Sequence, residues 1–325
     1  MHCELVVPGL FSAKAEIRLP ALELLLARGR RHGEQAQHLE AWLHDAFGLE
    51  EQPMAAGALT LLAANVDPGD ASWVRADPVH LRLMRDHLVI MPAEALTITG
   101  EEAAALCAAL NGHFAGTMQV RVVDPRRWCA RVDKVFSSSD HSSLEDAGRE
   151  VTLGDPLLNE IQMLLHAHPV NEAREARGEP PVNSLWLWGA GPAPKARSRW
   201  NTVLADEPIA TGLARLAKAG YRPLPASAGA WLERAPEDGR YLMVLDALRA
   251  PAALDDIASY KENLNALEAA WFAPLLDALR AGRIGMITVH VPGGKDTGGE
   301  ASSFETVRGD LRRFWRRAKA LESYA

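Results

Sequence analysis

The sequence predicts an α/β protein, in which strands and helices alternate along the chain. Short apolar runs such as 240–247 (RYLMVLDA) and 284–291 have the length and composition of buried strands. Other segments, such as 20–28, carry leucines every three or four residues, which is typical of a helix with one buried face. This alternation favours helices packed on a central sheet.

Composition and charge exclude several classes of protein. At 325 residues the chain is long enough for one large or two medium domains, and its formal net charge of -7 argues against a general nucleic-acid binder. Cys3, Cys107 and Cys129 are odd in number and widely spaced, which fits a reducing compartment better than a disulfide framework or a zinc site. The start of the chain lacks signal-peptide character, and no run approaches the ~18 apolar residues of a membrane span. We therefore expect a cytoplasmic protein with no nucleic-acid or membrane partner.

The beginning of the chain predicts one strand followed by helices. The run ELVV at 4–7 has strand character and ends at Pro8-Gly9. A helix is expected at 20–28, ended by Gly29, and a second one around 36–47.

Arg75, Asp77 and His80 lie close together in the segment 72–82 (SWVRADPVHLR). One interpretation is a phosphate or carboxylate pocket, in which the arginine donates and the aspartate orients the histidine. The other is an Asp-Pro helix start with a satisfied histidine. Asp77 and His80 are therefore candidate ligand contacts.

The run 87–123 predicts part of a small α+β unit. Strands are expected at 88–91, 96–99 and 119–123, and a helix at 101–110 with its cap near Thr99 or Gly100.

The stretch 166–191 (HAHPVNEAREARGEPPVNSLWLWGAG) is the densest in unusual side chains. Asn171 and Arg174 point to one side if their segment is helical. The arginine has donors suited to a carboxylate or phosphate, and the asparagine offers both a donor and an acceptor. A buried strand is expected at 182–188, followed by Gly189-Ala190-Gly191-Pro192 at its carboxyl end, where ligands bind in open α/β sheets. The alternative is structural: such a glycine loop is usually a tight turn, and surface Asn and Arg are usually solvated.

The whole constellation HPVNEAREARGEPPVNSLWLWGAGPAP resembles the segment hPxNxxRxxxGxxxaNxxxxxGxGxxP of archaeal-type cofactor-independent phosphoglycerate mutases, members of the alkaline-phosphatase superfamily. With EIQMLLHAHPVN before it, the WLWG form is closer still to bacterial regulatory proteins of the RpfE type, as is RADPVHL. The matching positions imply ligand contacts at Asn171, Arg174, Asn183, Gly189 and Gly191. The resemblance also implies an alkaline-phosphatase-like central sheet flanked by helices (1–70 and 236–325) with an inserted smaller α+β, mutase-like domain (71–235).

The chain departs from the mutase pattern where the family carries its catalytic groups. The metal-binding aspartate at the end of the first strand is replaced by Pro8-Gly9. The segment PMAAGALTLLAANVDP resembles the family's PGSdvAnlsllGyDP, which carries the nucleophilic serine, and puts Ala56 at that position. Alanine cannot form a covalent phosphoryl intermediate. Thr60 is the nearest hydroxyl, four residues further on.

The family's later metal ligands are also incomplete. Its Asp-x-x-x-His pattern has only carboxylates here, Asp246 with Asp255 and Asp256, and its TaDHsTP motif leaves at most His290. Asp246 with Asp255 is one weak site for a hard cation, whereas the favoured alternative is that Asp255-Asp256 caps a helix starting at Ile257.

Further helices are expected towards the end of the chain. One opens at Glu207-Pro208, and Pro274 kinks or restarts another. The segment 304–319 predicts a basic amphipathic helix with Phe314 and Trp315. Its favoured interpretation is packing of the aromatics on the sheet, and the alternative is a contact site for an acidic protein partner.

Two functions remain open. The first is a catalytically degenerate mutase relative with a regulatory or metabolite-sensing role, which needs no cofactor and binds a small phosphorylated or carboxylate metabolite. The second is an active phosphoglycerate mutase or phosphatase that depends on Mn²⁺ or Mg²⁺.

Overall fold

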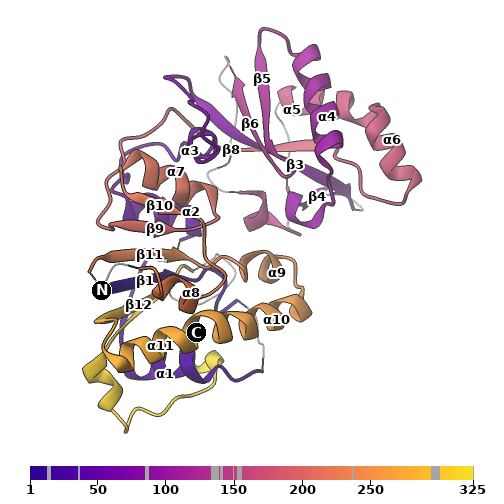
Figure 1. The fold of residues 1–325 in the computed structure, drawn as a ribbon. Coiled ribbons are helices and arrows are strands. Elements are labelled where there is room, and N and C mark those ends of the chain that lie inside the picture. The colour runs from indigo at the N-terminus through magenta and orange to yellow at the C-terminus, as the bar shows by residue number, and fades with distance from the viewer. Residues whose placement is uncertain are drawn as a thin grey trace. The chain divides into compact units, whose positions relative to one another are not determined.

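The computed structural model describes residues 1–12, 16–35, 37–84, 88–132, 139, 142–148, 150–151, 156–235, 238–293 and 301–324. The chain forms two compact units, of which unit 1 combines 1–48 with 196–325 and unit 2 is 49–195 (Figure 1). The boundaries expected from the sequence, 70/71 and 235/236, lie inside these units. They differ because the chain from 196 to 235 adds strands to the sheet of unit 1, and the helix at 56–63 packs on the sheet of unit 2.

Unit 1 is built on a seven-stranded sheet in the order β10-β9-β11-β1-β12-β13-β2. The pairs from β10 to β12 are parallel, and the pairs that β13 makes with β12 and β2 are antiparallel. The strands are β1 (His2–Val6), β2 (Arg30–Gly33), β9 (Thr202–Leu204), β10 (Gly220–Arg222), β11 (Arg240–Val244), β12 (Met286–Val291) and β13 (Ser302–Val307). The helices are α1 (Pro20–Arg28), α2 (Leu39–Ala46), α7 (Pro208–Leu216), α8 (Ala228–Leu232), α9 (Arg249–Ala253), α10 (Ile257–Leu267) and α11 (Ala273–Ala281).

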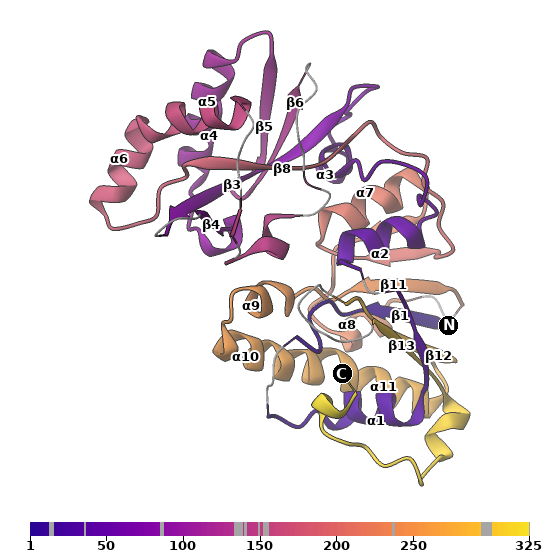
Figure 2. The same ribbon diagram turned by 180° about the vertical axis from the view of Figure 1, so that it is seen from behind.

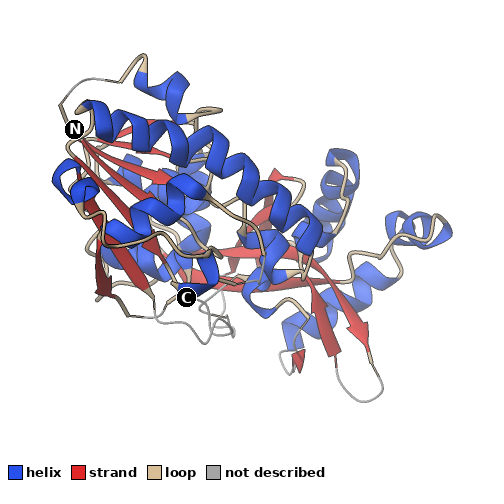
Figure 3. Cartoon of the chain, turned by 90° about the horizontal axis from the view of Figure 1, so that it is seen from below, coloured by secondary structure: helices blue, strands red, loops and turns tan. Residues whose placement is uncertain are grey.

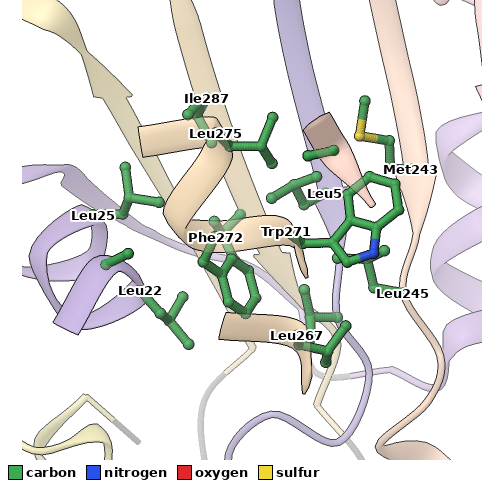
Figure 4. Packing of buried hydrophobic residues seen from close by; sticks show 14 of the residues in the cluster. Leu5, Leu22, Leu25, Met243, Leu245, Leu267, Trp271, Phe272, Leu275 and Ile287 are labelled. Carbon is green, nitrogen blue, oxygen red and sulfur yellow. The ribbon is translucent and has the colours of Figure 1, made fainter. Parts of the chain in front are cut away.

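One face of this sheet carries the main apolar core of unit 1. Leu5 and Ile287 point from neighbouring strands towards Trp271 and Phe272, and Leu22 of α1 packs against the same group (Figure 4). Each such side chain contributes about 1.5–3 kcal/mol through burial. The helical run from α10 through a π-helical turn to α11 lies along the strands (Figures 1 and 3).

The opposite face of the same sheet is polar near its centre. Because side chains alternate along a strand, Glu4 faces away from Leu5 and lies on the side of Thr288 and His290. Trp42 of α2 contacts the His290 ring on this side, with 4.9 Å between ring centroids. Charged groups are therefore buried on one face and apolar groups on the other.

Unit 2 is built on a six-stranded sheet in the order β5-β6-β3-β4-β7, with β8 paired to β3 (Figure 2). Every pairing among its strands is antiparallel. The strands are β3 (Trp73–Leu83), β4 (Leu88–Met91), β5 (Met118–Asp124), β6 (Arg127–Val132), β7 (Glu150–Val151) and β8 (Ser184–Gly191). The helices are α3 (Ala56–Ala63), α4 (Gly100–His113), α5 (Pro156–His166) and α6 (Pro169–Ala176). Helices α4 and α5 pack on one face of the sheet and α3 on the other.

Predictions that depend on local capping are confirmed. Thr99 caps α4 in a capping box with Glu102, and Glu207 accepts hydrogen bonds from the first turn of α7. Asp256 caps α10, which is the favoured alternative for the Asp255-Asp256 pair. Pro274 restarts the helix at α11.

Three predicted elements are wrong. Segment 72–82 is no helix start: β3 runs through Pro78, which pairs with Leu185. Segment 96–99 is not a strand, because Thr99 already serves as the cap of α4. The C-terminal basic helix does not form, because Phe304 lies in β13 between β12 and β2.

The basic segment that follows β13 therefore has a different form. A 3-10 turn spans Arg308–Arg312, and Phe314 and Trp315 are 77% and 66% exposed instead of packing on the sheet. In the part of the chain that the structure describes, no helix is both long and apolar enough to cross a bilayer.

Candidate functional site

Arg75 and Asp77 form a closed cluster beneath α3 in unit 2. Arg75 Nε donates to Asp77 Oδ1 at 3.0 Å, and Arg75 Nη1 donates to Thr60 Oγ1 at 3.2 Å. The Trp188 indole donates to Asp77 Oδ2 at 2.7 Å, and the guanidinium lies 5.3 Å from the centre of the Trp188 ring. Burial raises the pKa of Asp77 in spite of Arg75 and Trp188. Arg75 and Asp77 form a buried ion pair, and Thr60 and Trp188 bind the remaining polar atoms of that pair within unit 2.

His80 lies on the other face of β3, because it is three residues from Asp77 in a strand. Its Nδ1 is 2.9 Å from the carbonyl oxygen of Pro181, so Nδ1 carries the proton and donates it. Burial lowers the pKa of His80. The prediction that Asp77 orients His80 is wrong, since the two side chains point apart.

Asn171 and Arg174 are brought together on the buried side of α6, as their spacing predicts. Asn171 Nδ2 donates to the carbonyls of Leu165 and Val182, at 2.7 and 2.8 Å, and its Oδ1 accepts from the Val182 amide at 2.9 Å. The Asn171 side chain therefore joins the end of α5 to the segment before β8.

Arg174 is fully buried and ties α6 to the start of α4. Its Nε donates to the Pro180 carbonyl at 2.9 Å, and its Nη1 donates to the Thr97 carbonyl and to Glu102 Oε2, each at 2.8 Å. Nη2 of Arg174 has no hydrogen-bond partner among the described residues. The Arg174 guanidinium therefore donates to two backbone carbonyls and one carboxylate, which link α6 to α4 and to the segments before α4 and β8.

Asn183 also binds backbone groups. Its Oδ1 accepts from the Leu81 amide at 2.7 Å and its Nδ2 donates to the Leu81 carbonyl at 2.9 Å, which imitates a strand pair between β3 and the residue before β8. The amides of Asn171 and Asn183 are used in this way for the architecture of unit 2.

Gly189 and Gly191 allow a close approach between β8 and the start of α3. A Cβ at Gly189, where φ is +59°, would lie 2.4 Å from the Cβ of Ala56. A Cβ at Gly191 would lie 3.0 Å from Pro53. The glycine loop predicted after a strand at 182–188 is instead part of β8, an antiparallel strand that extends through Gly191. The glycines thus meet the segment 53–56 of the same unit.

The residue in the nucleophile position of the mutase-like pattern lies at this contact. Ala56 is the first residue of α3 and is fully buried. Ala55 before it has φ of 50° and ψ of 34°, a left-handed conformation that is rare outside glycine. The turn before α3 therefore has a strained backbone, and the side chains of Ala55 and Ala56 are methyl groups.

In unit 1, His290 is enclosed by two carboxylates on the polar face of the sheet. His290 Nδ1 lies 2.9 Å from Glu34 Oε1, and His290 Nε2 lies 3.3 Å from Glu4 Oε2. Burial lowers the pKa of His290, but the hydrogen bonds to Glu34 and Glu4 outweigh it and leave the pKa above its ordinary value. Both nitrogens of the imidazole are engaged by carboxylates, which favours its cationic form.

Glu4 is the centre of this network. Arg199 and Arg240 donate to its two oxygens at 2.6 and 3.2 Å. Burial opposes its charge, but the hydrogen bond from His290 and the charge of Arg199 lower the pKa of Glu4 to about 2. Sequence reasoning missed Glu4, Glu34 and both arginines, although a lone carboxylate within the apolar run CELVV signals a buried partner.

A second group of carboxylates lies near the ends of β9 and β11. Burial raises the pKa of Glu207 to about 7 against its hydrogen bonds with the amides of α7, and the nearby charges of Glu40 and Asp246 add to the increase. Arg249 Nη2 donates to Glu40 Oε1 at 2.6 Å. Within this group, the Glu40 carboxylate is therefore paired with the Arg249 guanidinium.

The residues present do not fit the metal pair of the alkaline-phosphatase pattern. Among the described residues, no three His, Cys, Asp or Glu side chains converge in a way that would hold a metal ion. Both nitrogens of His290 are engaged by carboxylates, and Asp255 is exposed at the turn before α10.

Comparison with known proteins gives short matches to one kind of enzyme. No family model matches the chain. A 2,3-bisphosphoglycerate-independent phosphoglycerate mutase of Methanosarcina barkeri is 42% identical over 48 residues, which are 15% of this chain and 12% of that protein. A probable enzyme of the same name from Geobacter sulfurreducens is 45% identical over 42 residues, or 13% of this chain and 10% of that protein. The chain is similar to cofactor-independent phosphoglycerate mutases.

Comparison with solved structures concerns the fold alone. The PH0037 protein from Pyrococcus horikoshii aligns over 94% of this chain and 87% of its own, with a TM-score of 0.56 and 14% identity. A cofactor-independent phosphoglycerate mutase from Thermoplasma acidophilum aligns over 100% and 94%, with a TM-score of 0.47 and 18% identity. The predicted fold class, a mixed α/β protein with a central sheet flanked by helices, is confirmed.

Proposed function

We propose that this chain is a catalytically degenerate phosphoglycerate mutase relative with a regulatory or metabolite-sensing role. The observation that carries the proposal is the start of α3, where Ala56 occupies the position that the mutase-like pattern gives to a nucleophilic serine. A phosphoryl intermediate needs an oxygen or sulfur nucleophile beside a base or metal. The closest side-chain hydroxyl on α3, Thr60, is fully buried and accepts from Arg75.

The donor set of unit 1 supports the same proposal. The strand end that carries a metal-binding aspartate in the family carries Pro8-Gly9 here, and His290 is committed to Glu4 and Glu34. The Glu40 carboxylate is paired with Arg249. A divalent cation entering this region would have to displace bound cationic side chains.

A regulatory role accounts for the resemblance to the RpfE-type proteins, and the bound metabolite would be a small phosphorylated or carboxylate compound. The alternative function is an active metal-dependent mutase or phosphatase, with Thr60 as the nucleophile under a four-residue shift.

Turnover measurements test the proposal. The chelator-treated protein is assayed with 3-phosphoglycerate and with p-nitrophenyl phosphate, before and after addition of Mn²⁺ or Mg²⁺, beside the Methanosarcina barkeri enzyme as positive control. We expect no metal-dependent turnover. Metal-dependent turnover that disappears in Thr60→Val would overturn the proposal in favour of the alternative.

Ligand binding is tested by thermal shift with 3-phosphoglycerate, because a ligand at about 100 times its dissociation constant stabilises a fold by roughly 2.7 kcal/mol. A shift that is independent of Mn²⁺ supports a sensor. A shift that requires Mn²⁺ contradicts the loss of the metal site.

A further inference from the structure

Unit 1 contains a cavity of about 380 Å³ on the core side of its sheet, close to the β10 edge. It lies between β9, β11, α8 and the segment that follows β10. Cavities that bind small molecules begin at about 300 Å³, so this one has room for a compact ligand.

The floor of the cavity is mainly aromatic and belongs to the packed core. Leu204, Trp231 and Tyr241 belong to the main core of unit 1, and the Trp231 and Tyr241 rings meet edge to face with 5.0 Å between their centroids. Pro223 and Pro225 form part of the wall, where their rings fix the backbone φ. The floor is therefore packed into the core, and the wall at 223–225 has restricted backbone freedom.

The charged side chains among the described lining residues of the cavity are arginines. Arg222 and Arg234 both line it and are exposed, and neither forms an ion pair with a side chain that the structure describes. No aspartate or glutamate is among its described lining residues. Thr202 adds a hydroxyl. This contrasts with Arg75, Arg174 and Arg199 elsewhere in the chain, each of which binds a carboxylate.

We propose that this cavity binds a small anion, a carboxylate or a phosphate, carried on a flat apolar body. The guanidinium groups of Arg222 and Arg234 bind the anionic group through charge-assisted hydrogen bonds, for which their planar donors are suited. The aromatic floor accepts the apolar body, since ring faces and edges favour flat partners. The proposal goes beyond the loss of catalysis proposed above, because the cavity uses other elements than Ala56 and the His290 network.

Isothermal titration calorimetry on the full chain tests the proposal with three probes. Benzoate and phenyl phosphate present the two anions on the same ring, and benzamide is their neutral analogue. We expect both anions to bind, benzamide to bind at least about tenfold more weakly, and Arg222→Ala and Arg234→Ala each to weaken anion binding about tenfold. The matched control is Arg283→Ala, an exposed arginine of unit 1 that does not line the cavity.

The two anionic probes also distinguish the kind of ligand. Tighter binding of phenyl phosphate indicates a phosphate ester as the natural ligand, and tighter binding of benzoate indicates a carboxylate. The proposal is overturned if neither anion binds, if benzamide binds as tightly as benzoate, or if the Arg222/Arg234 double alanine variant retains the affinity of the original chain. Both arginines are exposed, so their removal leaves folding intact, which a thermal unfolding curve checks. Turnover is measured separately, so failure of this proposal and failure of the proposed function are distinguishable.

Discussion

The two units satisfy their buried charges in different ways. In unit 2, the fully buried Arg174 donates to two backbone carbonyls and to Glu102. In unit 1, the buried Glu4 accepts only from side chains, including the titratable His290. Backbone carbonyls keep their charge distribution at every pH, whereas a carboxylate and an imidazole do not. The backbone contacts of Arg174 therefore serve the architecture of unit 2 at any pH, whereas the Glu4–His290 contact of unit 1 depends on pH.

The largest expected effect is that of Arg174→Met. Removing the guanidinium leaves the carbonyls of Thr97 and Pro180 and the carboxylate of Glu102 without their donor, so we expect unfolding free energy to fall by about 3–5 kcal/mol. The loss is measured by urea unfolding near neutral pH. The control is Arg177→Met, because Arg177 reaches the same Glu102 from the surface and should change stability little. Equal effects of the two variants would contradict the architectural role of Arg174.

The second effect concerns Glu4→Gln in unit 1. We expect the free energy of unfolding to fall by about 2–3 kcal/mol near neutral pH. The effect is smaller than that of Arg174→Met because Arg199 and Arg240 are half-exposed. The folded pKa of Glu4, about 2, is below its ordinary value of 4.5, so its contribution is complete above pH 4.5 and is lost as the pH falls towards 2. The stability difference between the original chain and the variant should therefore shrink over that range. If this stability difference stays constant between pH 4.5 and 2, the network around Glu4 is not the pH-sensitive part of unit 1.

A smaller effect is expected for Gly189→Ala. The new Cβ overlaps Ala56 at a backbone with φ of +59°, which should cost about 2 kcal/mol. Gly178→Ala is the matched control, because φ there is +74° and a Cβ would meet no atom within 4 Å. The added variant Ala56→Gly should recover part of the loss. A Gly189→Ala variant as stable as the control would show that β8 and α3 do not need their close contact.

Local sequence signals predicted much of the fold. The caps at Thr99, Glu207 and Asp256 act on amides two or three residues away, so the sequence contains the whole interaction. The helix predicted for the C-terminal segment was wrong because Phe304 lies in β13, which pairs with the preceding strand β12 and with β2 from near the start of the chain. The arginine spacing in this segment is typical of a helix, but strand pairing with β12 and β2 decides its structure instead.

For the candidate site, the sequence predicted where side chains lie better than it predicted what they bind. Asn171 and Arg174 do share one side of a helix, but their partners are carbonyls of Leu165, Val182 and Thr97, which no spacing along the chain reveals. In the polar network of unit 1, the sequence indicated His290 through the family motif and Glu4 as a lone carboxylate in CELVV, whereas Glu34, Arg199 and Arg240 were missed.

The most direct test of the central claim is a search for a covalent phosphoryl group. The chain is incubated with 3-phosphoglycerate and Mn²⁺, quenched in acid, and its intact mass is measured beside that of the Methanosarcina barkeri enzyme. Because Ala56 has no nucleophilic atom, we expect the mass to remain that of the unmodified chain. A mass increase of one phosphoryl group, mapped to Thr60 or another hydroxyl of unit 2, would contradict the account.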